Sequence, residues 1–307
     1  MATYDRLAAC LFAGAIGDAY GSSYEQAASA RNDSRIYYPF GRPPEPRRRW
    51  RLTDDTQLTL ATCEAIIECG GQARPEAIAA TFRQHFEAGQ LTGLGSSTLH
   101  ALQGLVAGGH WSQVGRGGDY AAGNGAAMRI APLAFLGPEP DRQLVEAVCR
   151  ITHRHPEAYA GALAVVLGIR AGLADDWTDR ASLLPCISAG LPDTRVRDRL
   201  LELQAQPAGL SIADVAARFG SGGYVVESVA LALWAAAQVP RLGLAAVLAE
   251  VCAAGGDTDT TCSLAGQVAG ARLGTAALPT ALWQRLQRLP DYVRLQTVIA
   301  RFAQHAR

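Results

Sequence analysis

The stretch GGDTDTTCSLAGQVAGARLG, residues 255–274, combines a close-packing helix with a concentration of acid. Its second half is a helical run of small residues, with Gly266 and Gly270 four positions apart on one helix face. Its first half crowds Asp257 and Asp259 beside threonines, with no basic residue nearby in the chain. Small residues let helices approach closely, whereas neighbouring unpaired carboxylates repel. The stretch therefore predicts a tightly packed core helix. The carboxylates at its N-terminal end need a source of positive charge.

Helical periodicity dominates the remaining chain, and the alternating apolar pattern of strands is nearly missing. The connections are short and rich in Gly, Pro, Asp and Ser, apart from one irregular stretch at about 26–52, typical of a functional or mobile loop. The chain has neither a fixed repeat nor a linker. We expect one compact all-α domain over residues 1–307, an orthogonal multi-helix bundle. Helices are expected at 5–19, 56–69, 75–88, 96–107, 124–136, 140–152, 156–174, 193–206, 211–219, 224–239, 241–254, 259–273, 279–288 and 291–306.

Composition narrows the class of protein. The 307 residues are 49% hydrophobic and 18% charged with zero net charge, which predicts a large core and no nucleic-acid footprint. Seven cysteines without a CxxC motif favour a reducing compartment, so a cytoplasmic location is expected. LAACLFAGAIG at 7–17 follows a segment that is not net positive, unlike a signal peptide. No uncharged apolar run reaches membrane-spanning length, so no membrane association is expected.

A second acidic cluster lies in LTDDTQLTL, residues 52–60. Both clusters directly precede helical runs, where a carboxylate can cap the free N–H groups. Capping explains one acidic residue in each cluster. It does not explain why both clusters contain two acidic residues together with hydroxyl side chains. Four carboxylates and two hydroxyls suit a pair of hard divalent cations, Mg²⁺ or Mn²⁺, that share a bridging carboxylate. The oxygen donors that the two clusters offer are Thr53, Asp54, Asp55 and Thr56 in one and Asp257, Asp259 and Thr260 in the other.

Three further stretches have the composition of functional loops. GAIGDAYGSSYE, residues 14–25, is expected to end a helix at its glycines and then to offer Glu25. AAGNGAAMR, residues 121–129, is a Gly-Asn-Gly turn before a helix, which could bind a phosphate or simply cap the helix. THRHPEA, residues 152–158, offers His153 and His155, but no partners fall at zinc spacing, so hydrogen-bonding histidines are favoured.

Six segments, in order, resemble the ADP-ribosylglycohydrolases, which include dinitrogenase-reductase-activating glycohydrolases and ADP-ribosylhydrolases. They are GAIGDAYGSSYE, LTDDTQLTL, GNGAAMRIAPLA, THRHPEA, GYVVESVALALWA and GGDTDTTCSLAGQVAGARLG, which together cover the chain from about residue 5 to 275. The resemblance implies an all-α fold with a central two-metal centre. It also implies cleavage of the glycosidic bond at the distal ribose of ADP-ribose, from arginine or serine side chains of a modified protein.

The resemblance also implies individual roles. The implied metal ligands are Thr53, Asp54, Asp55, Asp257, Asp259 and Thr260, with Asp259 as the bridging ligand. Glu25, on a mobile loop above the metals, is implied as a catalytic carboxylate together with Asp55. Asp18 also matches a family aspartate and is interpreted as structural. The residues implied to bind ADP-ribose are Gly123, Asn124, Gly125, Met128 and His153.

Several questions stay open at this level. Ala121 and Ala122 replace larger residues of some family members, so contacts around the distal ribose would be reduced or would come from another loop. A non-catalytic ADP-ribose-binding or structural relative is the alternative function. The linkage, the modified substrate, Mg²⁺ versus Mn²⁺, and a regulatory or toxin-immunity role are undetermined, and a monomer is the default expectation.

Overall fold

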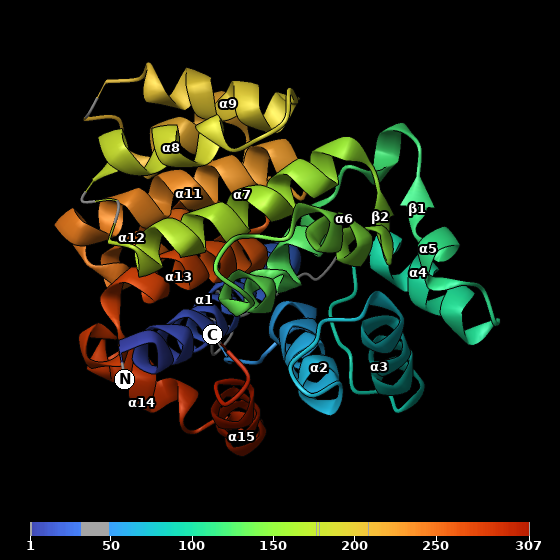
Figure 1. Ribbon diagram of the computed structural model, residues 1–307. Helices are drawn as coiled ribbons and strands as arrows, with labels where there is room; N and C mark the ends of the chain where they lie inside the picture. The colour runs from blue at the N-terminus through green and yellow to red at the C-terminus, as the bar shows by residue number, and fades with distance from the viewer. Residues whose placement is uncertain (1, 32–48, 176, 178, 208, 307) are drawn as a thin grey trace, which may run out of the picture.

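The computed structural model describes residues 2–31, 49–175, 177, 179–207 and 209–306. Within these residues the protein is built of helices arranged in layers (Figure 1). The described strands are β1 (Arg116–Gly117) and β2 (His153–Arg154), which pair in parallel. The prediction of an all-α fold is confirmed, whereas the single domain over residues 1–307 stays a prediction.

Helices α1 (Ala2–Arg31) and α13 (Thr258–Leu273) form the most intimate pair in the fold. They run antiparallel with their backbones in contact, since a Cβ at Gly17 would collide with the carbonyl of Cys262. A Cβ at Gly266 would likewise collide with the carbonyl of Ala13. The small residues of the opening stretch are therefore packing positions, and they place the end of α1 directly over the acidic start of α13.

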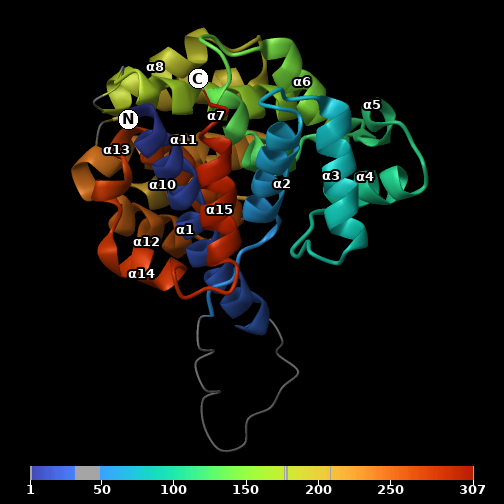
Figure 2. The same ribbon diagram turned by 60° about the horizontal axis from the view of Figure 1, so that its bottom comes forward.

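Helices α7 (Pro156–Leu173) and α11 (Val225–Leu242) pack on α13 and complete the centre of the core. By length and composition α11 could cross a membrane, but 78% of it is buried here, as in the core helix of a soluble protein. On the other side, α2 (Asp54–Glu68) packs between α3 (Pro75–Glu87) and α15 (Tyr292–Phe302). Figure 2 shows α15 lying alongside α1 and α2.

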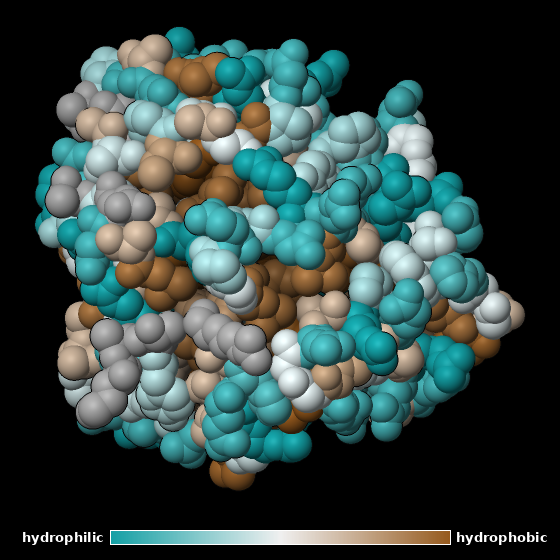
Figure 3. All heavy atoms as spheres, in the orientation of Figure 1, coloured by the Kyte–Doolittle hydropathy of each residue, from teal (hydrophilic) through white to brown (hydrophobic). Residues whose placement is uncertain are grey.

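The remaining helices cover this centre, and the face in Figure 3 is mostly polar, with apolar side chains visible between the helices near its middle. They are α4 (Ser96–Val106), α5 (Trp111–Val114), α6 (Arg142–Arg150), α8 (Arg180–Ala189), α9 (Arg195–Gln204), α10 (Ile212–Phe219), α12 (Leu244–Ala254), α14 (Thr280–Leu286), and the 3₁₀ helices η1 (Asp119–Ala121), η2 (Asn124–Arg129), η3 (Ala131–Phe135) and η4 (Thr275–Ala277).

Three local predictions are wrong. The first helix does not end at Gly17 or Gly21 but continues to Arg31, because these glycines serve helix contact rather than a turn. Glu25 therefore lies on a helix and not on a mobile loop, and of the expected irregular stretch 26–52, residues 32–48 lie outside the described residues.

The helix expected at 124–136 is instead η2 and η3, because Pro132 lacks the N–H that an α-helix needs. Helix α8, which contains Pro185, was not predicted.

Candidate active site

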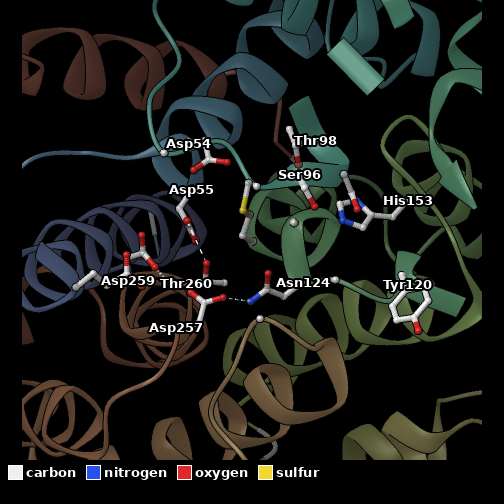
Figure 4. A pocket seen from close by; sticks show the side chains of 18 residues that line it. Asp54, Asp55, Ser96, Thr98, Tyr120, Asn124, His153, Asp257, Asp259 and Thr260 are labelled. Carbon is white, nitrogen blue, oxygen red and sulfur yellow. Dashed lines mark hydrogen bonds between the residues drawn. The ribbon is translucent and has the colours of Figure 1, made fainter. Parts of the chain in front are cut away.

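A cavity of about 380 Å³ opens where α1, α2, α4, α13 and the η2 turn meet. Figure 4 shows carboxylates gathered at one end, Asn124 in the middle, and His153 and Tyr120 toward the other end. Segments more than 200 residues apart in sequence meet at this cavity, since Thr260 donates a hydrogen bond to Asp55 at 3.2 Å. The two acidic clusters of the sequence therefore share one site.

Glu25, Asp257 and Asp259 form the tightest acidic group, with one oxygen from each lying within 4.8 Å of the others. Asp257 and Asp259 flank the first residue of α13, and the close α1–α13 contact brings Glu25 over them. Asn124 Nδ2 donates to Asp257 Oδ2 at 2.8 Å, which orients that carboxylate toward the cavity. The structure thus adds Glu25, predicted as catalytic, to the set of possible metal ligands.

Asp54 and Asp55 open helix α2 on the facing wall. Asp55 is buried, and its Oδ2 accepts a hydrogen bond from Thr260 Oγ1 at 3.2 Å; Thr53 Oγ1, whose hydrogen is donated to Asp18, lies 3.3 Å from the same oxygen. The Oδ1 of Asp55 is buried without a hydrogen-bond partner among the described residues. An unpaired buried carboxylate oxygen is costly, so this atom is suited to ligating a cation.

Asp18 does not line the cavity but fixes the start of α2. It is fully buried and accepts hydrogen bonds from the backbone N–H and hydroxyl groups of both Thr53 and Thr56. Burial raises its pKa to about 6, although these hydrogen bonds oppose the shift. These contacts agree with the structural role expected for Asp18. They also use the hydroxyl hydrogen of Thr53, a predicted metal ligand that does not line the cavity.

Burial and the crowding of negative charge raise the pKa values of the carboxyl groups at the acidic end of the cavity. Burial, then the charge of Asp18, raises the pKa of Asp54 to about 7, and the same two causes raise that of Asp55 well above its ordinary value. Burial, then the charges of Asp55 and Asp257, raises the pKa of Asp259 to about 12. None of the described residues lining the cavity is an arginine. An all-oxygen donor set with excess negative charge fits hard divalent cations such as Mg²⁺ or Mn²⁺.

The opposite end of the cavity is built on the Gly-Asn-Gly turn. Gly123, Asn124, Gly125 and Met128 line it, and the backbone N–H of Asn124 donates a hydrogen bond to the carbonyl of Gly223 at 3.1 Å. His153 is buried against this turn, since a Cβ at Gly123 would lie 3.1 Å from its Nε2. Burial, then the charge of Arg129, lowers the pKa of His153 to about 3, so its imidazole is neutral.

The segment TGLGSST, residues 92–98, was not predicted as part of the site but lines the cavity at the start of α4. Glycines and hydroxyl residues directly before a helix could have identified it, because such a segment offers free N–H groups to an anion. Tyr120, 89% exposed, also lines the cavity. It lies one residue before Ala121, where the sequence predicted reduced contacts.

The structure therefore brings all but one of the predicted site residues to one cavity, and the exception is Thr53. His155 instead caps α7, where its Nδ1 accepts from the N–H of Glu157 at 3.1 Å. Among the described residues, no group of metal-ligating side chains forms around His153 and His155. The preference for hydrogen-bonding histidines over a zinc site agrees with this arrangement.

Known proteins resemble the chain over nearly its full length. The protein YegU of Escherichia coli, itself uncharacterized, is 28% identical over 98% of both chains. The ADP-ribosylarginine hydrolase Tri1 of Pseudomonas putida is 27% identical over 90% of this chain and 72% of its own. The ADP-ribosylhydrolase ARH3 of Homo sapiens is 24% identical over 91% of this chain and 88% of its own.

A solved structure titled ADP-ribosylglycohydrolase-related protein complex shares the fold, with a TM-score of 0.71 at 22% identity and 99% coverage of both chains. The sequence profile described as ADP-ribosylglycohydrolase matches residues 1–307. The full-length match agrees with the six ordered sequence motifs and with the all-α fold. The chain therefore belongs to the ADP-ribosylglycohydrolase family.

Proposed function

We propose that the protein is a metal-dependent hydrolase that removes ADP-ribose from modified protein side chains. The reaction consumes one water and breaks the glycosidic bond at the anomeric carbon of the distal ribose, which releases free ADP-ribose and the unmodified side chain. Family membership and the names of two relatives, an ADP-ribosylarginine hydrolase and an ADP-ribosylhydrolase, support this reaction class. We keep a cytoplasmic location and a monomer as expectations.

One observation carries the proposal: a single cavity has an acidic end and a neutral, glycine-lined end. The acidic end suits cations and a sugar that becomes positively charged in the transition state. The opposite end offers the start of α4, whose N–H groups suit a diphosphate, beside the turn at Gly123–Gly125. A sugar joined to a diphosphate matches this division of charge.

The acidic residues would hold two divalent cations. Asp54 and Asp55 would contribute from α2, and Asp257, Asp259 and Thr260 from α13, with Asp259 as the shared ligand. When bound, the cations supply positive charge that polarises water and orients the ribose hydroxyls. The unpartnered Oδ1 of Asp55 is the single atom that most supports this assignment.

Glu25 is the side chain best placed to move a proton. Burial, then the charge of Asp257, raises its pKa, so it retains a proton more readily than an exposed glutamate. It would donate that proton to the departing atom, which becomes a hydroxyl for serine or a guanidine nitrogen for arginine. Negative charge on Asp55 and Asp257 would stabilise the oxocarbenium character of the ribose.

Release of free ADP-ribose from two model substrates, one ADP-ribosylated on arginine and one on serine, tests the proposal. Each substrate is assayed with Mg²⁺, with Mn²⁺, with a chelator, and with Asp257→Ala. We expect release from at least one substrate, lost with the chelator and reduced at least about 100-fold by Asp257→Ala. Binding of ADP-ribose without release from either substrate would instead identify a binding-only relative or another linkage.

A further inference from the structure

Beneath the Gly-Asn-Gly turn lies an arginine that the reaction does not use. Arg129 is fully buried, and its guanidinium lies over the ring of Phe82 at 4.7 Å from the ring centroid. Its Nε donates to the carbonyl of Gly125 at 3.2 Å, and its Nη2 donates to Thr152 Oγ1 at 2.6 Å. Burying a guanidinium is costly. The two hydrogen bonds offset part of this cost and tie Gly125 and Thr152 to the buried arginine.

Thr152 connects this arginine to the cavity. Its Oγ1 lies 2.8 Å from Nδ1 of His153, the histidine that lines the cavity. An arginine N–H can only donate, so Thr152 Oγ1 accepts from Arg129. The hydroxyl hydrogen is then left to donate, and the only hydrogen-bond acceptor it contacts in the described part of the chain is His153 Nδ1. Donation by His153 Nδ1 instead would leave that buried hydroxyl hydrogen without an acceptor, which is unfavourable.

We propose that Arg129 and Thr152 are positioning residues that hold His153 as the Nε2–H tautomer, so that Nε2 donates a hydrogen bond to an oxygen of the nucleoside diphosphate sugar. The identity of the ligand that Nε2 binds rests on the proposed function, whereas the tautomer of His153 does not. His153 then binds substrate as a fixed neutral donor and does not transfer a proton.

The surroundings of Nε2 agree with a donor aimed into the cavity. His153 lines the cavity, and its Nε2 lies so close to Gly123 that a Cβ there would be 3.1 Å away, so the missing side chain lets the ring pack against the turn. The charged and titratable groups that act on the ring are Arg129, Arg116 and His155, all of which disfavour a second proton. The tautomer is therefore expected to stay the same between about pH 5 and 8.

The imidazole nitrogens of ¹⁵N-labelled, ligand-free protein test this directly, because two-bond ¹H–¹⁵N correlations distinguish a protonated from an unprotonated ring nitrogen. His153 is assigned by the signals lost in His153→Gln. We expect an unprotonated Nδ1 and a protonated Nε2 in the unaltered protein. Thr152→Val should give a mixture of tautomers, whereas Thr152→Ser, which restores the hydroxyl, should return the original pattern.

The functional readout is the Kd for ADP-ribose measured by calorimetry. We expect Thr152→Val to weaken binding about three- to ten-fold, and Thr152→Ser to stay within about two-fold. Thr62→Val is the matched control, because it removes an equally buried threonine hydroxyl that bonds only within α2. If Thr152→Val does not fold, Thr152→Ala removes the same hydroxyl without adding bulk.

Two results would overturn the proposal: a protonated Nδ1 in the unaltered protein, or an unchanged tautomer and Kd in the variant lacking the hydroxyl. A changed tautomer with an unchanged Kd would overturn the contact between Nε2 and the ligand. Absence of ADP-ribose binding by the unaltered protein would contradict the proposed function and this ligand, while the spectra would still decide the tautomer.

Discussion

Helix α2 carries carboxylates near both ends, and their surroundings are opposite. At its start, Asp54 and Asp55 face other carboxylates and hydroxyl groups. Near its end, Glu64 accepts hydrogen bonds from Arg294 at 3.0 Å and contacts His85 Nε2 at 2.7 Å. Burial alone would oppose ionisation of Glu64, but His85 and Arg294 outweigh it and lower its pKa. At Asp55, burial and neighbouring acids act together and raise the pKa.

The comparison separates two uses of a carboxylate on the same helix. Glu64 is neutralised by the fold itself, since Arg294 ties α15 to α2 and His85 ties α3 to α2. The acids at the other end have no such cation among the residues lining the cavity, so the fold leaves their charge to be neutralised by something that binds. A pairing arginine therefore indicates structure, and its absence at a buried cluster indicates a ligand site.

The largest expected effect comes from removing one charge at the acidic end. Asp55→Asn keeps the shape of the side chain but takes away its charge, and should lower hydrolysis at least about 100-fold. It should also raise the melting temperature of metal-free protein, because it relieves repulsion. Kinetic assays and thermal unfolding in a chelator measure both. Full activity of Asp55→Asn would contradict a catalytic or metal-binding role for this residue.

The next prediction concerns pH and metal. Folded-state pKa values above the ordinary carboxyl value mean that the native, metal-free protein binds protons more tightly than the unfolded chain. The contribution of these carboxyls to stability should therefore be largest below the ordinary aspartate pKa of 3.8 and should be lost as pH rises from there through about 7, the raised pKa of Asp54. The gain in melting temperature on adding Mg²⁺ should grow between about pH 5 and 8, because cation binding displaces those protons.

Thermal unfolding at several pH values, with Mg²⁺ and with a chelator, checks this. His85 is a confounding group, because hydrogen bonding to Glu64 raises its pKa and the stabilisation it gives is also lost as pH rises. The series is therefore repeated in Glu64→Gln, where this partner has no charge. A Mg²⁺ gain that is the same at both ends of the pH range would contradict the interpretation of the acidic cluster.

The smallest effect on stability and activity is expected near the C-terminal end of α2, where Glu64 is paired with Arg294 and His85; this is called the paired end. Glu64→Gln should lower the free energy of unfolding by only about 1 kcal/mol, since Arg294 is 34% exposed and solvent screens the pair. The paired end should stabilise the fold most between the ordinary pKa values of 4.5 for Glu64 and 6.5 for His85. Chemical denaturation measures the change, and Mg²⁺ binding and hydrolysis should stay unaltered. A large loss of activity here would break the distinction between the two ends.

Local patterns predicted many of the helices closely, including α3, α7 and α13, because their apolar periodicity and their capping or proline residues agree. The error at α1 has a different origin. Gly17 and Gly21 look like helix-ending residues, but the partner helix α13 needs their missing side chains. Propensity is a local preference, and the tertiary contact overrides it.

The site divides in the same way. Both acidic clusters could be predicted as sites because two acids with hydroxyls at a helix start exceed what a cap needs, and the Gly-Asn-Gly turn because the family resemblance implies a binding role for it. That the start of α4 lines the same cavity, and that Glu25 reaches it from an unbroken helix, could not be predicted, because both depend on which helices meet around the cavity. The same holds for the path from Arg129 through Thr152 to His153, which joins residues 23 positions apart.

The sequence by itself therefore determined that this protein is helical, that it concentrates acid at two helix starts, and that it resembles one family. Only the tertiary structure decided that these two starts face each other, that Glu25 joins them from an unbroken helix, and that Glu64 is paired while Asp55 is not. The physical reason is that charge acts through space, so the partner of a carboxylate is known only when the helices have packed.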